Sequence, residues 1–181
     1  MRPEVYWIRD IEPLRFAMMP RPRGGEWLAD EVAGWKQMGM DTVVSLLHQY
    51  EASELEILED EQLCVSHGIR YHSFPIKDRG TPESEREFVE LSRELAAAVK
   101  EGFAVAVHCR AGIGRSGLLA GAVLLHLGIS VSDVFPTLSR ARGLAVPDTP
   151  AQALWFHSVA SRMRSNNSLE SDAFKATRAS S

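Results

Sequence analysis

A cysteine, a run of small residues and an arginine lie close together in residues 108–116 of this 181-residue chain. The string reads His-Cys-Arg-Ala-Gly-Ile-Gly-Arg-Ser, so Arg115 follows Cys109 by six positions. An apolar alternating run, residues 103–107, precedes the string, and an apolar run of helical type, residues 117–125, follows it. A strand, a loop and a helix N-terminus in this order favour anion binding, because free backbone N–H groups point into such a loop. We therefore expect an anion site with a thiol at its base.

The residue types of this loop suit an attack on phosphorus. A cysteine among inward-facing N–H groups at a helix N-terminus is shifted toward the thiolate, which is its nucleophilic form. The planar guanidinium of Arg115 can hold two phosphoryl oxygens and stabilise their charge in the transition state. Gly112 and Gly114 let the backbone approach the phosphate and turn without a clash at Cβ. Ser116 can donate a hydrogen bond to the sulfur of Cys109 and assist its departure when a phosphoenzyme is hydrolysed.

The whole string is similar to the signature of the protein tyrosine phosphatase superfamily, His-Cys-x-x-Gly-x-x-Arg-Ser, with every fixed position filled. This resemblance implies a phosphatase in which Cys109 is the nucleophile and Arg115 clamps the phosphate. His108 is expected to orient the loop by hydrogen bonding rather than to take the substrate proton. A buried cysteine before an amphipathic helix is the structural alternative, and a Walker-type nucleotide loop is excluded because no Gly-Lys-Ser/Thr follows the glycines. The residues expected to bind the substrate phosphate beside Arg115 are Arg110, Ala111, Gly112, Ile113 and Gly114.

Attack by a thiolate expels an alkoxide or phenoxide, so a general acid is needed beside the leaving group. Asp78 is the expected acid, because it follows a short strand and lies in a loop before a helix, 31 residues upstream of Cys109. The surrounding string resembles the acid loop of small dual-specificity phosphatases, most of all the kinase-associated type with Pro-Ile-x-Asp-Gly-Gly-Thr-Pro, although Arg79 replaces the first of those glycines. Asp78 could instead be a solvated loop carboxylate or a turn former. Weaker rivals for the acid lie within or beside helix and strand patterns: Asp41, Asp60 and Asp133.

Gln152 and Cys64 each have two open interpretations. Gln152 is either part of an ordinary capping box at a helix start or, by the resemblance, the loop glutamine that positions the hydrolytic water. Cys64 is either a small buried hydrophobe on a helix or, by the resemblance, a redox partner that forms a reversible disulfide with Cys109. Arg140 and Arg142 either face the phosphate cleft or are solvated charges at a helix end.

Length and composition agree with a single phosphatase-like domain. A chain of 181 residues with 45% hydrophobic content can bury a substantial core. A net charge of −4 gives no indication of a basic surface that would bind nucleic acid or an anionic membrane. Two cysteines are too few for a disulfide framework, and neither a signal peptide nor a run of transmembrane length is recognised. We expect a cytoplasmic monomer that needs no metal and no cofactor and whose partner is a phosphorylated protein.

The rest of the chain alternates strands and helices. Besides the strand before Cys109, strands are expected over residues 5–8, 14–18, 42–47 and 69–74. Besides the helix after Arg115, helices are expected over residues 26–38, 53–65, 82–100, 131–141 and 150–163. Helical crossovers imply a single-domain α/β fold with a central, mostly parallel sheet flanked by helices, which is also the architecture that the resemblance implies. We expect the catalytic domain over residues 1–164 and a flexible C-terminal tail over residues 165–181.

The sequence thus predicts a phosphatase that hydrolyses phosphotyrosine or phosphoserine/threonine esters on proteins through a cysteinyl-phosphate intermediate. The same mechanism on a phosphoinositide, an inositol phosphate or an RNA 5′-phosphate is the alternative. It is disfavoured because superfamily members that take inositol lipids often carry lysines in the loop, where Ala111 and Ile113 stand here. A non-catalytic module that binds phosphoresidues is a third possibility, but such modules usually have a damaged signature. The small chain favours a shallow cleft of dual-specificity type.

Overall fold

The computed structural model describes residues 2–163, and the predicted tail over residues 165–181 lies outside them. Within the described residues, one sheet has the strand order β1-β2-β5-β3-β4. Only the pair β1–β2 is antiparallel; the other neighbouring strands are parallel. The strands are β1 (Tyr6–Trp7), β2 (Phe16–Met19), β3 (Thr42–Ser45), β4 (Arg70–Ser73) and β5 (Val105–His108). The expected mostly parallel α/β fold is therefore confirmed, with strands somewhat shorter than predicted.

The central strand β5 positions the cysteine loop. Its last residue, His108, is in register with Met19 at the end of β2 and with Ser45 at the end of β3. All four residues of β5 are buried, as expected for a parallel strand covered by helices on both faces. Because parallel strands end at the same edge of a sheet, Cys109 leaves β5 where β2 and β3 also end. The loop that follows is therefore built on the middle of the carboxyl edge.

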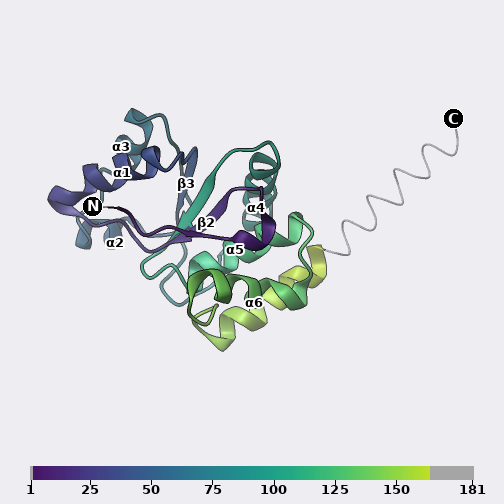
Figure 1. Cartoon of the computed structure of the whole chain (residues 1–181). Coiled ribbons are helices and arrows are strands. Elements are labelled where there is room, and N and C mark those ends of the chain that lie inside the picture. Colours follow the sequence, from purple (N-terminus) through teal and green to yellow (C-terminus); the bar gives the residue numbers. More distant parts are fainter. Residues whose placement is uncertain (1, 164–181) are drawn as a thin grey trace, which may run out of the picture.

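Helices cover both faces of the sheet (Figure 1). Alternate residues of the strands enter two separate clusters of buried side chains: Phe16 and Met18 of β2 pack on one face, Ala17 and Met19 on the other. The first cluster contains side chains from α4 (Glu85–Lys100), α5 (Gly114–His126), α6 (Val131–Arg142) and the helix over residues 150–163. The second contains side chains from α1 (Leu28–Gln37) and α3 (Asp60–Ser66). Short elements complete the order: η1 (Arg9–Ile11), η2 (Gly25–Trp27) and α2 (Gln49–Glu54).

The expectation of one helix over residues 53–65 is wrong. Two short helices, α2 and α3, take its place, and Ser53 lies within α2 rather than at a helix start. Glu56 between them has a φ of 55°, which ends the first helix. Ile57 follows it and is completely buried in the second cluster. The burial of this one side chain outweighs the local helical pattern and turns the chain inward.

Other helix limits shift by a few residues. The long helix α4 begins at Glu85 rather than at Pro82, because the hydroxyl of Ser84 accepts a hydrogen bond from the backbone N–H of Glu87 at 3.2 Å and caps the first turn. The first turn of the helix expected from Glu26 is the 3-10 turn η2, and α1 starts after it. Among residues 2–163, no helix has both the length and the apolar character that are needed to cross a membrane.

Candidate active site

A cavity of about 200 Å³ lies over the loop between β5 and α5. It collects residues from three separate parts of the chain: the loop after β4, the cysteine loop with the start of α5, and the segment that leads into the first turn of the helix over residues 150–163. Its lining consists of Asp78, Arg79, Cys109, Arg110, Ala111, Ile113, Gly114, Arg115, Asp148 and Gln152. The structure thus brings together the expected nucleophile, clamp, acid and loop glutamine.

Cys109 lies at the base of this cavity and is only 3% exposed. Its sulfur accepts a hydrogen bond from the backbone N–H of Gly112 at 3.3 Å. Gly112 has a φ of 68°, and a Cβ built at this position would overlap the backbone of Met19 and Pro20. Glycine is thus required twice here, by the left-handed backbone and by the close approach of β2. The close packing holds the loop so that one of its N–H groups points at the sulfur.

Arg115 is held in place from several directions before any ligand binds. Its side chain is 2% exposed, and its two terminal nitrogens bond to the two carboxylate oxygens of Glu51 at 2.7 and 3.0 Å. One of these nitrogens also donates to the carbonyl oxygen of Ile76 at 3.0 Å, and the other lies 3.0 Å from a carboxylate oxygen of Asp78. A bidentate pair fixes the plane of the guanidinium as well as its position. The clamp is therefore oriented by the fold rather than by the substrate.

Glu51 is the functional residue that sequence reasoning missed. It lies on α2, is 1% exposed, and accepts a hydrogen bond from the backbone N–H of His48 at 3.1 Å in addition to those from Arg115. Burial raises the pKa of Glu51, but the hydrogen bonds from Arg115 and from the His48 backbone outweigh that effect, and the net pKa lies below its usual range. The carboxylate therefore stays charged. Its only signal in the sequence is its place three residues after His48, which is typical of a helix cap.

Asp78 lies at the mouth of the cavity, with its side chain 52% exposed and ion-paired to Arg115. This position lets it contact a leaving group that points toward solvent while the phosphate lies deeper. The three rival aspartates do not line the cavity. Asp60 accepts a hydrogen bond from a tyrosine hydroxyl, Asp41 accepts one from a backbone N–H, and Asp133 accepts one from a serine hydroxyl. The placement favours Asp78 as the acid.

The acid loop is connected to the segment before the last described helix. Arg79 has a φ of 57°, the left-handed conformation in which glycine is most easily accommodated. Its exposed side chain lies 3.7 Å from a carboxylate oxygen of Asp148 across the mouth of the cavity. On the inner side, the amide nitrogen of Gln152 donates to the carbonyl oxygen of Gly80 at 2.9 Å. These contacts hold the acid loop over the cysteine loop.

The contacts of Gln152 bear on both of its interpretations, the capping of a helix and the positioning of water. Its backbone N–H donates to the hydroxyl of Thr149 at 3.2 Å, which is a capping interaction. Its side chain, however, is completely buried and faces the cavity instead of turning back to the helix start. The side-chain carbonyl oxygen has no hydrogen-bond partner among residues 2–163. This oxygen is itself buried, and the positioning of water by Gln152 stays a prediction.

Arg142 supports the cysteine loop from outside the cavity. Its guanidinium donates to the carbonyl oxygens of Ala111 at 2.9 Å and of Gly112 at 3.0 Å, and it lies 3.9 Å from the centre of the Tyr6 ring. Holding these carbonyl groups outward keeps the N–H groups of the loop inward. Arg140, by contrast, is exposed and pairs with Asp10 at 3.2 Å. Neither arginine lines the cavity over the cysteine loop.

His108 and Ser116 lie on either side of the loop, and both are completely buried. The His108 ring packs near Trp35, with ring centres 6.2 Å apart. Burial lowers the pKa of His108 to about 4, and the nearby Cys109 backbone offsets this only in part. Among the described residues, neither its ring nitrogens nor the Ser116 hydroxyl makes a hydrogen bond of good geometry. The orienting role of His108 and the donor role of Ser116 therefore stay predictions.

Cys64 lies apart from Cys109. It belongs to α3 and to the cluster on one face of the sheet, whereas Cys109 belongs to the cluster on the other face. Both cysteines are free. Burial raises the pKa of Cys64 to about 12, so its thiol is neutral at ordinary pH. These observations favour the role of a small buried hydrophobe, and the redox partnership stays a prediction without support from the geometry.

The burial of His108 predicts a fold that is sensitive to acid. As the pH falls from 6.5 toward 4, the unfolded chain takes up a proton that the folded chain does not, so the free energy of unfolding falls by up to about 3 kcal/mol. His108→Asn should remove this part of the pH dependence. Urea unfolding of both proteins at pH 7.5 and 5 measures the difference, with His157→Asn at an exposed position as control. Equal pH dependence in wild type and His108→Asn contradicts the prediction.

Comparison with known proteins points to one family. The family model described as cyclin-dependent kinase inhibitor 3 matches residues 27–135. Cyclin-dependent kinase inhibitor 3 of Rattus norvegicus is 32% identical over 124 residues, which cover 67% of this chain and 58% of that protein. A structure of kinase associated phosphatase, with its catalytic cysteine replaced by serine, has a TM-score of 0.80 and 22% identity over 91% of this chain and 97% of that one. Tk-PTP in its active form has a TM-score of 0.68 and 26% identity, covering 90% and 99%. The chain thus spans less than two thirds of the length of the curated relative.

Proposed function

Because the chain belongs to the cyclin-dependent kinase inhibitor 3 family, within the cysteine-dependent protein tyrosine phosphatase superfamily, we propose that it hydrolyses phosphomonoesters on proteins through a cysteinyl-phosphate intermediate. The observation that carries this proposal is the convergence of Cys109, Arg115 and Asp78 on one cavity of about 200 Å³. A nucleophile, a cation clamp and an acid together supply what the displacement requires.

In the first step, the substrate phosphate binds among the loop N–H groups and against Arg115. The sulfur of Cys109 attacks phosphorus, so that an S–P bond forms while the P–O bond to the leaving group breaks. The incoming phosphate replaces Asp78 as a partner of Arg115, so Asp78 in its protonated form gives its proton to the departing oxygen. The guanidinium is already oriented by Glu51, so little reorganisation opposes the transition state.

In the second step, water attacks the phosphocysteine. Asp78, now ionised, takes a proton from that water, and the S–P bond breaks to release inorganic phosphate. Gln152 lines the cavity, its side-chain oxygen has no hydrogen-bond partner among residues 2–163, and we assign this oxygen to hold the water. Ser116 lies directly after Arg115 on the first turn of α5, and we assign its hydroxyl to the departing sulfur.

The substrate class is a phosphoprotein with phosphotyrosine, phosphoserine or phosphothreonine. The small cavity and the exposed Asp78 at its mouth support a shallow site of dual-specificity type. Ala111 and Ile113 in the loop give no extra positive charge for a polyphosphorylated inositol headgroup. The rat relative is named an inhibitor of a cyclin-dependent kinase, so a phosphorylated protein kinase is one candidate substrate. We further propose a monomer in the cytoplasm, where the Cys109 thiol stays reduced.

Hydrolysis of phosphopeptides tests the proposed substrate class. With EDTA present, the protein should hydrolyse p-nitrophenyl phosphate and at least one of a matched pair of phosphotyrosine and phosphothreonine peptides. The ratio of the two peptide rates measures how deep the cleft is. Turnover of p-nitrophenyl phosphate without turnover of any phosphopeptide would contradict a protein substrate and would favour a small phosphate ester.

The role of Asp78 predicts a dependence on the leaving group. Asp78→Asn should slow hydrolysis of alkyl or phosphoserine esters by about 10²–10⁴-fold, because a poor leaving group needs the proton, and should slow activated aryl phosphates much less. The measurement is kcat/KM on a series of esters with graded leaving groups. Asp148→Asn is the matched control, since Asp148 is the other carboxylate that lines the cavity. Equal losses on all esters in Asp78→Asn would remove Asp78 as the acid.

A further inference from the structure

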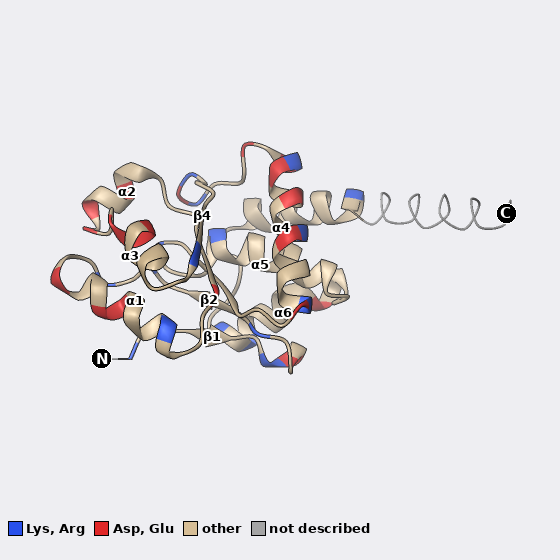
Figure 2. Ribbon diagram, turned by 90° about the horizontal axis from the view of Figure 1, so that it is seen from above, with Lys and Arg blue, Asp and Glu red and all other residues tan. Residues whose placement is uncertain are grey.

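A second cavity of about 340 Å³ adjoins the catalytic one, and Arg110 lines both. Its lining consists of Arg2, Glu4, Pro20, Arg21, Pro22, Arg23, Glu31, Trp35 and Arg110. Four arginines therefore meet two glutamates here, although the chain as a whole carries a net charge of −4. Figure 2 shows many of the carboxylates on the outer helices, among them α1, α3 and α4. The positive charge in this cavity is thus a local feature.

The segment over residues 20–23 is fixed against the catalytic loop. The backbone N–H of Arg21 donates to the carbonyl oxygen of Arg110 at 3.2 Å, and Gly112 packs against the Met19–Pro20 backbone. Two prolines restrict the segment, and the Arg21 side chain donates to the carbonyl oxygen of Pro22 at 2.9 Å. The position of Arg21 relative to the nucleophile is therefore set by the fold, which lowers the entropic cost of binding an anion there.

The two glutamates do not cancel the positive charge. Glu31 is 5% exposed and forms an ion pair with Arg23, so it offsets that arginine. Glu4 accepts a hydrogen bond from the hydroxyl of Tyr6 at 3.2 Å. Arg110 lies 3.6 Å from a carboxylate oxygen of Glu54. Arg2 and Arg21 line the same cavity and together exceed the remaining charge of Glu4 by one positive charge.

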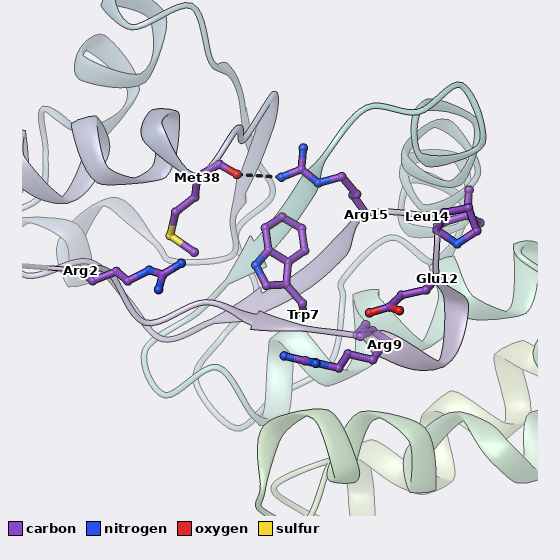
Figure 3. A pocket seen from close by; sticks show the side chains of 9 residues that line it. Arg2, Trp7, Arg9, Glu12, Leu14, Arg15 and Met38 are labelled. Carbon is purple, nitrogen blue, oxygen red and sulfur yellow. Dashed lines mark hydrogen bonds between the residues drawn. The ribbon is translucent and has the colours of Figure 1, made fainter.

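Positive charge continues beyond this cavity to the edge of the sheet. Arg2 also lines a cavity of about 620 Å³, which lies around Trp7 of the edge strand β1 (Figure 3). There Arg15 lies over the Trp7 ring, 5.0 Å from its centre, and donates to the carbonyl oxygen of Met38 at 2.7 Å. Arg9 lines this cavity as well. A polypeptide that leaves the cavity of Cys109 on this side meets more arginines than glutamates.

We propose that the cavity beside the cysteine loop is a second anion subsite, which binds a carboxylate or phosphorylated side chain of the same polypeptide substrate. The inference rests on the proposed function and narrows it to phosphoproteins with acidic sequence around the phosphoresidue. Guanidinium groups pair with carboxylates and phosphates through two parallel hydrogen bonds, which suits either anion. Because the two cavities share Arg110 and an extended chain advances about 3.4 Å per residue, the second anion lies within about three residues of the first.

Peptide series test the subsite. Each phosphotyrosine or phosphothreonine peptide carries one glutamate, one phosphoserine or one lysine at a single position, from three before to three after the phosphoresidue. At one or two neighbouring positions on the same side, glutamate should raise kcat/KM about five- to tenfold over lysine, mainly through KM, and phosphoserine should raise it further. The preference should shrink at high salt, because the subsite is open to solvent.

Charge reversal at Arg21 distinguishes an effect of this subsite on peptide preference from an effect of the protein's overall charge. Arg21→Gln should remove most of the preference for the glutamate peptide, and Arg21→Glu should reverse it in favour of lysine. Arg93→Glu is the matched control, since Arg93 lies on α4 and lines neither of the two cavities. Thermal unfolding checks that all variants are folded.

The experiments distinguish failure of the proposed subsite from failure of the proposed function. Equal kcat/KM on glutamate and lysine peptides, or a preference unchanged in Arg21→Glu, overturns the subsite and leaves the proposed function intact. Loss of the preference in Arg93→Glu to the same extent overturns it too, because general electrostatic attraction then explains the effect. If p-nitrophenyl phosphate is hydrolysed and no phosphopeptide is, the protein substrate itself is contradicted and the subsite with it.

Discussion

Cys109→Ser is expected to lower hydrolysis of p-nitrophenyl phosphate by about 10⁴-fold or more while the protein still binds a phosphorylated ligand. A serine hydroxyl is not ionised at neutral pH, so the loop loses its nucleophile. The Gly112 N–H group and Arg115 remain in place, and they are the groups that we expect to hold the phosphate. Initial rates with EDTA present measure the loss, and fluorescence anisotropy with a labelled phosphopeptide measures the retained binding.

The second cysteine of the chain provides the control for this variant. Cys64→Ala alters a buried thiol on the other face of the sheet and should keep the rate within a factor of about three, provided that thermal unfolding shows a folded protein. A Cys109→Ser protein with a rate within tenfold of wild type would contradict thiolate catalysis. Loss of ligand binding in the same variant would contradict the assignment of the phosphate site to the loop backbone and Arg115.

Glu51→Ala is expected to destabilise the protein by about 3–5 kcal/mol and to lower kcat strongly. The substitution leaves the guanidinium of Arg115, which is 2% exposed, without its bidentate partner. Removing one member of a buried ion pair costs this much because the remaining charge stays buried and uncompensated. The clamp also loses the carboxylate that sets its plane, so we expect a loss of about 10²-fold or more in kcat from misplacement. Urea unfolding gives the stability and steady-state kinetics give kcat.

A milder substitution separates the loss of stability from the loss of positioning. Glu51→Gln keeps the shape and one acceptor but removes the charge, so it should fold better than Glu51→Ala and still have a reduced kcat. Glu54→Gln, on the same helix with a side chain 61% exposed, is the matched control and should change stability by about 0.5 kcal/mol or less. If Glu51→Gln equals wild type in stability and in kcat, then the Ile76 carbonyl and Asp78 suffice to hold Arg115, and the assigned role of Glu51 is wrong.

The cysteine loop could be predicted from the sequence because its parts are adjacent in the chain. Cys109, Gly112 and Arg115 lie within seven consecutive residues, from the end of a strand to the first turn of a helix, so local pattern alone describes their neighbourhood. Glu51 could not be found in this way. Its importance comes from a contact with a residue 64 positions away, which exists only after α2 and α5 are placed by the sheet.

The difference between local sequence pattern and contacts formed in the fold also explains the errors in the helix limits and the alternatives that the sequence left open. Residues 53–65 look helical by themselves, but the burial of Ile57 decides where the chain turns. Likewise, Gln152 has a capping pattern in the sequence, and only its contact with Gly80 shows that the side chain faces the cavity. Arg142 donates hydrogen bonds to two carbonyl oxygens of the cysteine loop, and no sequence pattern predicts these contacts.

The central position of β5 has a consequence for chain synthesis. The strand pairs with β2 and β3, both of which come far earlier in the chain, and the cavity above it is completed by Gln152, which comes later. A nascent chain that ends soon after Cys109 has neither the clamp nor the glutamine, and its cysteine is an ordinary thiol on an incomplete fold. Long-range pairing of this kind forms late, because the ends of long loops must first be brought together. Under the proposed mechanism, the complete site around Cys109 therefore forms only when folding is complete.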